Sequence, residues 1–133
     1  MRDANSMPFV QISLKSGKSK EYKQAISDSI HDSLVDIFGI PKLDKFQIIN
    51  EVVEENIIYP TSYMDIPHTD EIIYIHITAK KGRSVDMKKK LYQHIVRNIN
   101  QKTSHNIDDI MIIMVENEEE NWSFGQGKAQ LVN

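Results

Sequence analysis

The order of apolar and polar residues predicts a strand, a helix and a second strand in the first part of the chain. Residues 10–14 alternate in polarity, which is the period of a strand with one buried face. Apolar residues then recur every four positions and predict a helix with one buried side, namely Tyr22, Ile26, Ile30, Leu34 and Phe38. Residues 46–53 are typical of a closing strand.

Local signals indicate where this helix begins and ends. Ser19 can cap its N-terminus, because the side-chain oxygen accepts a hydrogen bond from a free backbone N–H, and Glu21 lies favourably in the first turn. Gly39 suits the left-handed conformation of a helix end, and Pro41 prevents the helix from continuing.

A second segment has the same order. Residues 72–79 predict a strand, Ser84 a helix cap and residues 110–115 a closing strand, and the helix between them has an apolar stripe at Met87, Leu91, Ile95 and Ile99. Residues 54–70 carry two prolines and little periodicity. We therefore expect an irregular connection there, with a short hairpin at residues 57–59.

The two segments also match residue by residue. Gly17-Lys18-Ser19 recurs 65 positions later as Gly82-Arg83-Ser84. The same offset relates further pairs, among them Lys15 and Lys80, Lys23 and Lys88, Asp44 and Asp109, and Glu51 and Glu116. This predicts a duplication, with repeats at about 8–53 and 72–116 in a single domain of residues 8–133.

We therefore predict an α+β or α/β fold: a duplicated β-α-β unit forming a four-stranded mixed sheet, with two helices on one face, plus a short hairpin and a C-terminal segment. Strands joined through a helix in one sheet run parallel, with a right-handed crossover. The other face carries Phe9, Ile72 and Tyr74, which are too apolar to remain in water. We expect a homo-oligomer that covers this face.

Composition narrows the classes of function. The net charge of −3 gives no electrostatic reason to expect nucleic acid, and we expect the lysine run at 88–90 and the glutamate run at 118–120 to be solvated surface. Cysteine is absent, the five histidines lack the spacing of a metal site, and no apolar run reaches the ~20 residues of a membrane span. These features favour a cytoplasmic protein without a metal site.

Four segments carry a resemblance to a known family: Met7-Pro8-Phe9, residues 38–47 (FGIPKLDKFQ), Gly82-Arg83-Ser84 and residues 122–127 (WSFGQG). Together they resemble the tautomerase superfamily, and the second and fourth resemble its malonate semialdehyde decarboxylase-like branch. The resemblance extends from Pro8 to about residue 132. It implies the 4-oxalocrotonate tautomerase-like fold, and it implies a trimer for duplicated members.

In this family the catalytic group is a proline at the chain terminus, and Pro8 matches it. A terminal proline is a secondary amine whose pKa nearby cations and an apolar site can lower, so that it can move a proton beside a carbonyl. Asp44 matches the acidic partner, which in decarboxylase-like members orients or activates water. The resemblance implies no cofactor, because the amine and the cations supply the polarisation.

The resemblance also implies a substrate-binding set for a small carbonyl compound that bears a carboxylate. Arg83 matches one of two arginines that bind the carboxylate, and a planar guanidinium suits that role. The other arginine aligns with Lys80 or Lys81, so a lysine replaces it here. Trp122 and Phe124 match an apolar wall near the proline.

Residues 1–7 form a leader in front of the proline, and while it is attached the Pro8 nitrogen is an amide without basicity. Either translation naturally begins at Met7, the leader being a cloning remnant or a misplaced start, and removal of the methionine exposes the amine. Or the leader is native and the chemistry has been lost.

Each candidate residue also has a structural interpretation. Pro8 can simply start a strand, Asp44 can be a turn residue, and Arg83 can be a solvated loop cation. Trp122 and Phe124 can be core aromatics. We favour keto-enol tautomerisation, or decarboxylation of a 3-oxo acid such as malonate semialdehyde; the alternatives are a hydratase or dehalogenase and a non-catalytic oligomeric scaffold.

Overall fold

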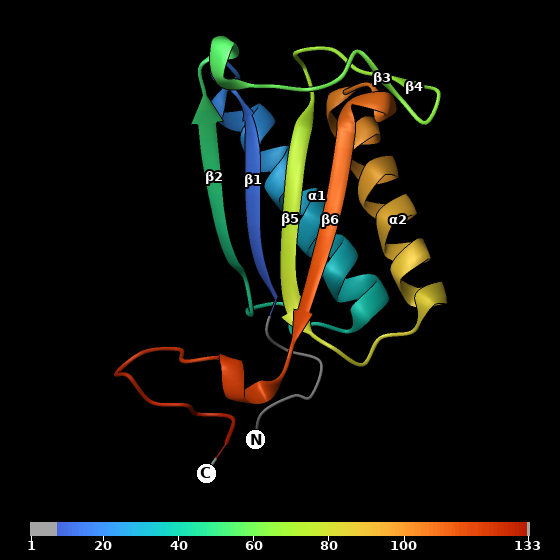
Figure 1. Ribbon diagram of the computed structural model, residues 1–133. Coiled ribbons are helices and arrows are strands. Elements are labelled where there is room, and N and C mark those ends of the chain that lie inside the picture. The colour runs from blue at the N-terminus through green and yellow to red at the C-terminus, as the bar shows by residue number, and fades with distance from the viewer. Residues whose placement is uncertain (1–7, 133) are drawn as a thin grey trace.

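The computed structural model describes residues 8–132 and contains two β-α-β units (Figure 1). The first comprises β1 (Phe9–Lys15), α1 (Lys20–Phe38) and β2 (Phe46–Val52), and the second comprises β5 (Ile73–Lys80), α2 (Val85–Thr103) and β6 (Ile110–Asn117). The predicted fold class is confirmed, and each strand ends close to its predicted position. The leader, residues 1–7, lies outside the described residues.

The four long strands form one sheet in the order β2-β1-β5-β6. Strands within a unit run parallel, whereas the central strands β1 and β5 pair antiparallel. In this central pair Gln11 lies opposite His76, its counterpart 65 positions later. The two units are therefore related by an approximate two-fold axis through the middle of the sheet, and both helices cover the same face (Figure 1).

The core lies between the sheet and the two helices. Most of the apolar stripes predicted for the helices are buried in it, and Tyr22 and Met87 pack partly buried against its edge. The inward side chains of the central strands complete it: Val10, Ile12, Leu14, Ile73, Ile75 and Ile77. Burial of one such side chain contributes about 1.5–3 kcal/mol. Within residues 8–132, no helix is both long and apolar enough to span a bilayer.

The predicted helix ends are confirmed in both units. The Ser19 side chain accepts a hydrogen bond from Tyr22 N at 3.0 Å, and Ser84 accepts one from Met87 N at 3.2 Å. Gly39 ends α1 with φ 70°, a left-handed conformation that costs glycine little. Ser104, 65 positions later, adopts φ 61° at the end of α2. The backbone geometry thus repeats even where the residue type does not.

An ion pair also repeats between each helix and its closing strand. Lys23 Nζ lies 2.9 Å from Glu51 Oε1 in the first unit, and Lys88 Nζ lies 2.7 Å from Glu116 Oε1 in the second. All four positions are related by the offset of 65. These pairs are partly exposed, and such pairs contribute about 0–1 kcal/mol each.

The connection between the units corrects one prediction. It contains the short helix η1 (Glu54–Asn56) and a hairpin of β3 (Ser62–Tyr63) and β4 (Ile66–Pro67), so the hairpin does not lie at residues 57–59. Met64 and Asp65 form its two-residue turn with φ 51° and 63°. Both values are positive, as in the tightest hairpin turns, which usually contain Asn-Gly or Asp-Gly. Met-Asp gave no such signal.

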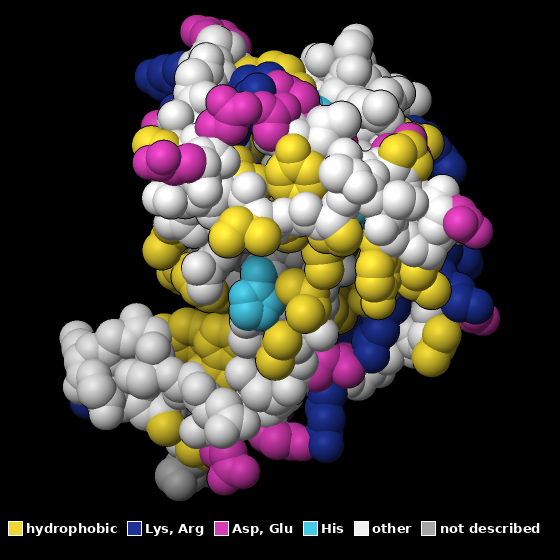
Figure 2. All heavy atoms as spheres, turned by 45° about the horizontal axis from the view of Figure 1, so that its top comes forward, with side chains coloured by type: hydrophobic (Ala, Val, Ile, Leu, Met, Phe, Trp, Pro, Cys, Tyr) yellow, Lys and Arg dark blue, Asp and Glu magenta, His cyan; other side chains and the backbone are white. Residues whose placement is uncertain are grey.

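The sheet face opposite the helices is apolar mainly along its edge strands. Phe46 in β2 and Ile113 in β6 are 53% and 50% exposed, and their exposed neighbours are Ile48, Met111 and Val115. Figure 2 shows hydrophobic side chains gathered across the middle of the molecule. Phe9 and Tyr74 lie on this face as expected.

Ile72 does not contribute to this open surface, contrary to the prediction, because it is only 1% exposed. The connection between the units lies across this end of the sheet. The hydroxyl of Tyr74 donates a hydrogen bond to the Ile58 carbonyl at 2.6 Å.

A buried aspartate fastens the same connection to β6. Asp109 ends the short helix η2 (Ile107–Asp109) and is 2% exposed. Its two carboxylate oxygens accept hydrogen bonds from Thr69 N at 2.8 Å and from Thr69 Oγ1 at 2.6 Å. Asp109 is the counterpart of Asp44 and has a structural role.

We expect Asp109→Ala to lower the free energy of unfolding by about 1–3 kcal/mol, because both donors of Thr69 lose a charged acceptor. Urea unfolding followed by circular dichroism measures this change. The neighbouring Asp108→Ala is the control and should stay within about 0.5 kcal/mol of the wild type. Equal effects of the two substitutions would show that the hydrogen bonds of Asp109 contribute nothing specific.

Candidate active site

One end of the sheet gathers the residues singled out from the sequence. β1 and β2 begin there, and β5 and β6 end there, because the central pair is antiparallel (Figure 1). Pro8 is buried and directly precedes Phe9. Phe9 lies between Phe46 of β2 and Thr78 of β5, so the proline is enclosed between two strands. We call this region the Pro8 end.

Aromatic side chains form a wall at the Pro8 end. Trp122 and Phe124 stack with ring centroids 5.7 Å apart, and Phe124 lies 6.4 Å from Phe46. The indole N–H of Trp122 donates a hydrogen bond to Asn117 Oδ1 at 2.6 Å. Asn117 is the last residue of β6 and pairs with Lys80. The wall is therefore attached both to the end of β6 and to the start of β2.

A guanidinium lies at the same end. Arg83 follows the end of β5 and donates a hydrogen bond from Nη1 to the Lys80 carbonyl at 2.7 Å. Its guanidinium carbon lies 4.8 Å from the centre of the Phe38 ring, within the range of a cation–π contact. The loop with Gly82 at φ 133° and the last turn of α1 thus orient this side chain.

The two candidate lysines are each paired with a glutamate. Lys80 Nζ lies 3.4 Å from Glu119 Oε1, and Lys81 Nζ lies 2.5 Å from Glu118 Oε1. The hydrogen bond with Glu118 raises the pKa of the Lys81 ammonium above its usual value. Lys80 is the more enclosed of the two, with 18% of its side chain exposed against 63% for Lys81.

Asp44 lies in the segment that joins α1 to β2 and leads into the Pro8 end. Its backbone N–H donates to the Pro41 carbonyl at 2.9 Å, which closes a turn, so the turn role considered for it is present. The buried His31 anchors the same segment, because its ring Nε2 bonds to the Lys42 carbonyl at 2.7 Å. The segment is therefore held against α1 rather than loose.

Some residues of this region gave no functional signal in the sequence. The sequence assigns Phe46 only to a strand, and Asn117, the last residue of β6, belongs to no motif. Glu118 and Glu119 are exposed, as expected, and at the start of the short helix η3 (Glu119–Asn121) they also pair with the lysines. The opposite charges of the lysines and the glutamates were a signal in the sequence. The two groups can pair only because β5 and β6 lie side by side, which the sequence does not show.

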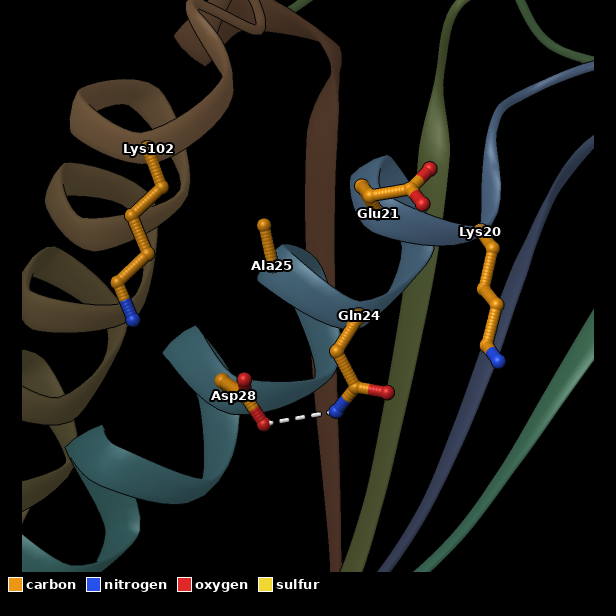
Figure 3. Close-up of a pocket in the computed structure, with 6 residues that line it drawn as sticks. All are labelled: Lys20, Glu21, Gln24, Ala25, Asp28 and Lys102. Carbon is orange, nitrogen blue, oxygen red and sulfur yellow. Dashed lines mark hydrogen bonds between the residues drawn. The ribbon is translucent and has the colours of Figure 1, made fainter.

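Away from the Pro8 end, a pocket lies on the outer side of the helices (Figure 3). It is lined by Lys20, Glu21, Gln24, Ala25, Asp28 and Lys102. Asp28 accepts hydrogen bonds from Gln24 at 3.0 Å and from Lys45 at 2.9 Å, and the Lys45 ammonium is the main cause that holds the pKa of Asp28 below its usual value. Lys102 lies 3.4 Å from Asp32, so two charged groups of the lining already pair with residues outside it. Residues 8–132 hold no cluster of metal-ligand side chains there or elsewhere.

The chain is similar to known proteins over most of its length. The models of two tautomerase enzyme families match residues 44–125 and 8–63. The probable tautomerase YusQ of Bacillus subtilis (strain 168) is 39% identical over 126 residues, which is 95% of this chain and 99% of that protein.

Solved structures are similar as well. The FG41 malonate semialdehyde decarboxylase inhibited by 3-bromopropiolate is 30% identical, with a TM-score of 0.85 and 92% of both chains covered. A fused 4-OT, a symmetric trimer, shares the fold at 14% identity, with a TM-score of 0.73 over 90% of this chain and 94% of that one. Because a tautomerase family model matches residues 44–125 and a probable tautomerase is 39% identical over 95% of the chain, the chain belongs to the tautomerase superfamily, and it is similar to the malonate semialdehyde decarboxylase branch.

Proposed function

We propose that this protein uses the Pro8 amine, when Pro8 is the mature N-terminus, for keto-enol tautomerisation of a small oxo acid. The observation that carries this proposal is the meeting of a buried proline, a guanidinium and an aromatic wall at one end of the sheet. The proline is enclosed between β2 and β5, where little water reaches it.

The chemistry follows from these surroundings. Neighbouring cations and partial burial disfavour the protonated form of a secondary amine and lower its pKa toward neutrality. The amine then accepts the proton of the enol hydroxyl as a general base and returns a proton to the carbon, which leaves the ketone. The wall of Trp122 and Phe124 keeps water away from the charged intermediate.

Arg83 is the proposed carboxylate-binding residue. Its planar guanidinium can donate two parallel hydrogen bonds to a carboxylate, and its contact with the Phe38 ring limits its motion. Lys80 and Lys81 lie beside it at the entrance, each paired with a glutamate. Asp44 is proposed to orient water or the substrate.

Decarboxylation of a 3-oxo acid is the second candidate, favoured by the likeness to malonate semialdehyde decarboxylase. In that reaction a protonated Pro8 amine polarises the 3-oxo group, the bond between the carboxylate carbon and C2 breaks, and carbon dioxide leaves. The electron pair passes into an enolate, which takes up the proton of the Pro8 ammonium at C2 and becomes the neutral carbonyl product. The same residues serve both reactions, and the protonation state of the amine selects between them.

We also propose a homo-oligomer, because another subunit would cover the exposed apolar residues on β2 and β6. The absence of cysteine is compatible with the cytoplasm, which is the location we propose. A trimer is the proposed form, in line with the trimeric fused 4-OT. A native chain that keeps its leader would instead favour the non-catalytic scaffold, since the Pro8 nitrogen would remain an amide. The mass of the protein isolated from its source distinguishes these cases.

For a chain that begins at Pro8, we expect Pro8→Ala to slow tautomerisation of an enol acid by about 10²–10⁴-fold, because the placed secondary amine is lost. The rate is measured by ultraviolet absorbance of the enol and by exchange of its carbon-bound proton for deuterium. Equal rates for the variant and the wild type would refute the proposal.

We expect Arg83→Gln to raise KM about 10–100-fold for an acid substrate, because a charged hydrogen-bond donor to the carboxylate is removed. Steady-state kinetics on the acid and on its methyl ester separate binding of the carboxylate from loss of structure, since the ester should respond much less. Arg97→Gln on the exposed side of α2 is the control and should match the wild type.

We expect Asn117→Leu to loosen the aromatic wall, because the Trp122 N–H loses its acceptor. The emission of Trp122, the single tryptophan, should shift to longer wavelength, and KM should rise about 3–10-fold, as expected for one lost hydrogen bond. Asn56→Leu at the opposite end of the sheet is the control. An unchanged emission maximum would show that Asn117 does not hold the ring.

A further inference from the structure

The lysines at the Pro8 end do not stand alone as a cationic site. β6 ends at Asn117, directly beside Lys80, and the chain turns at once into η3. The Asn121 side chain accepts a hydrogen bond from Glu118 N at 2.9 Å and stabilises this turn. The turn brings Glu118 to Lys81 and Glu119 to Lys80.

This pairing changes the charge that a substrate meets. Two lysines and two glutamates cancel, so this side of the entrance presents no net positive charge to a second carboxylate. A second anionic group placed here would lie near Glu118 and Glu119, and like charges at short distance repel. A cluster of lysines alone would instead attract it.

We propose that Glu118 and Glu119 determine the charge of the substrate, and that they restrict the site to acids with one carboxylate, bound at Arg83. This rests on the proposed function, because it concerns the acid that the Pro8 end accepts. The glutamates act by repulsion rather than by contact with the reacting atoms, which is a way of rejecting the wrong ligand.

The pairs are open to solvent, so substitution should leave the fold intact. About half of each glutamate side chain is exposed, and exposed ion pairs contribute little to stability. Glutamine keeps the size of glutamate and one acceptor oxygen, and it removes the negative charge.

The test measures binding of succinate, with two carboxylates, and of butyrate, with one carboxylate on a chain of the same length. Both are titrated at pH 7 and low salt, and Trp122 fluorescence reports binding without any need for turnover. We compare the wild type with the double variant Glu118→Gln/Glu119→Gln. The deciding quantity is the ratio of the dissociation constant of succinate to that of butyrate, measured for each protein.

We expect wild-type protein to bind butyrate at least as tightly as succinate. In the double variant the dissociation constant of succinate should fall about ten-fold, and that of butyrate should change by less than about three-fold. High salt should reduce the effect of the double substitution on succinate binding. An unchanged ratio overturns the proposal, and so does failure of both acids to bind to any of these proteins.

Glu71→Gln is the matched control. Glu71 pairs with Lys15 at 2.6 Å, and Lys15 is the counterpart of Lys80 at the far end of the sheet. This variant should leave the ratio unchanged, and an equal shift would mean that any loss of negative charge suffices. Discrimination between the acids in a protein that fails the proton-exchange assay would refute the Pro8 chemistry alone.

Discussion

The antiparallel pairing of β1 with β5 is the constraint on which the rest of this structure depends. Each β-α-β unit is parallel within itself, so the direction of the central pair decides which loops meet. Because that pair is antiparallel, the start of β1 meets the ends of β5 and β6. One region thereby holds Pro8 from the beginning of the chain, Arg83 from the middle and the aromatic wall from the end.

Much of the fold follows from periodic features that the sequence displays. Alternation located β1 and β5, the closing strands β2 and β6 were also predicted, and Ser19, Gly39 and Ser84 marked helix ends that the structure confirms. The hairpin was misplaced, because Met64-Asp65 lacks the usual turn residues although its backbone adopts the turn. Ile72 was wrongly assigned to the open surface, since the alternation of a strand does not show which of its residues other parts of the fold bury.

The candidate residues were found by resemblance, but the contacts that hold them were not. Trp122 is held by Asn117, and the segment with Asp44 is held by His31, each through one hydrogen bond with a residue that belongs to no motif. Glutamates 118 and 119 look like solvated charge in the sequence. Only the neighbouring ends of β5 and β6 bring them to the lysines, and such proximity depends on tertiary structure.

The approximate two-fold axis has a consequence for how such a protein can change over evolution. In an assembly of identical single units, every substitution appears at both ends of the sheet, and the two effects must be tolerated together. Joined in one chain, the copies vary independently, and here Asp44 closes a turn before β2 whereas its counterpart Asp109 fastens a loop. Duplication thus lets the two ends of the sheet differ, and at the end away from Pro8 the buried Asp109 serves stability.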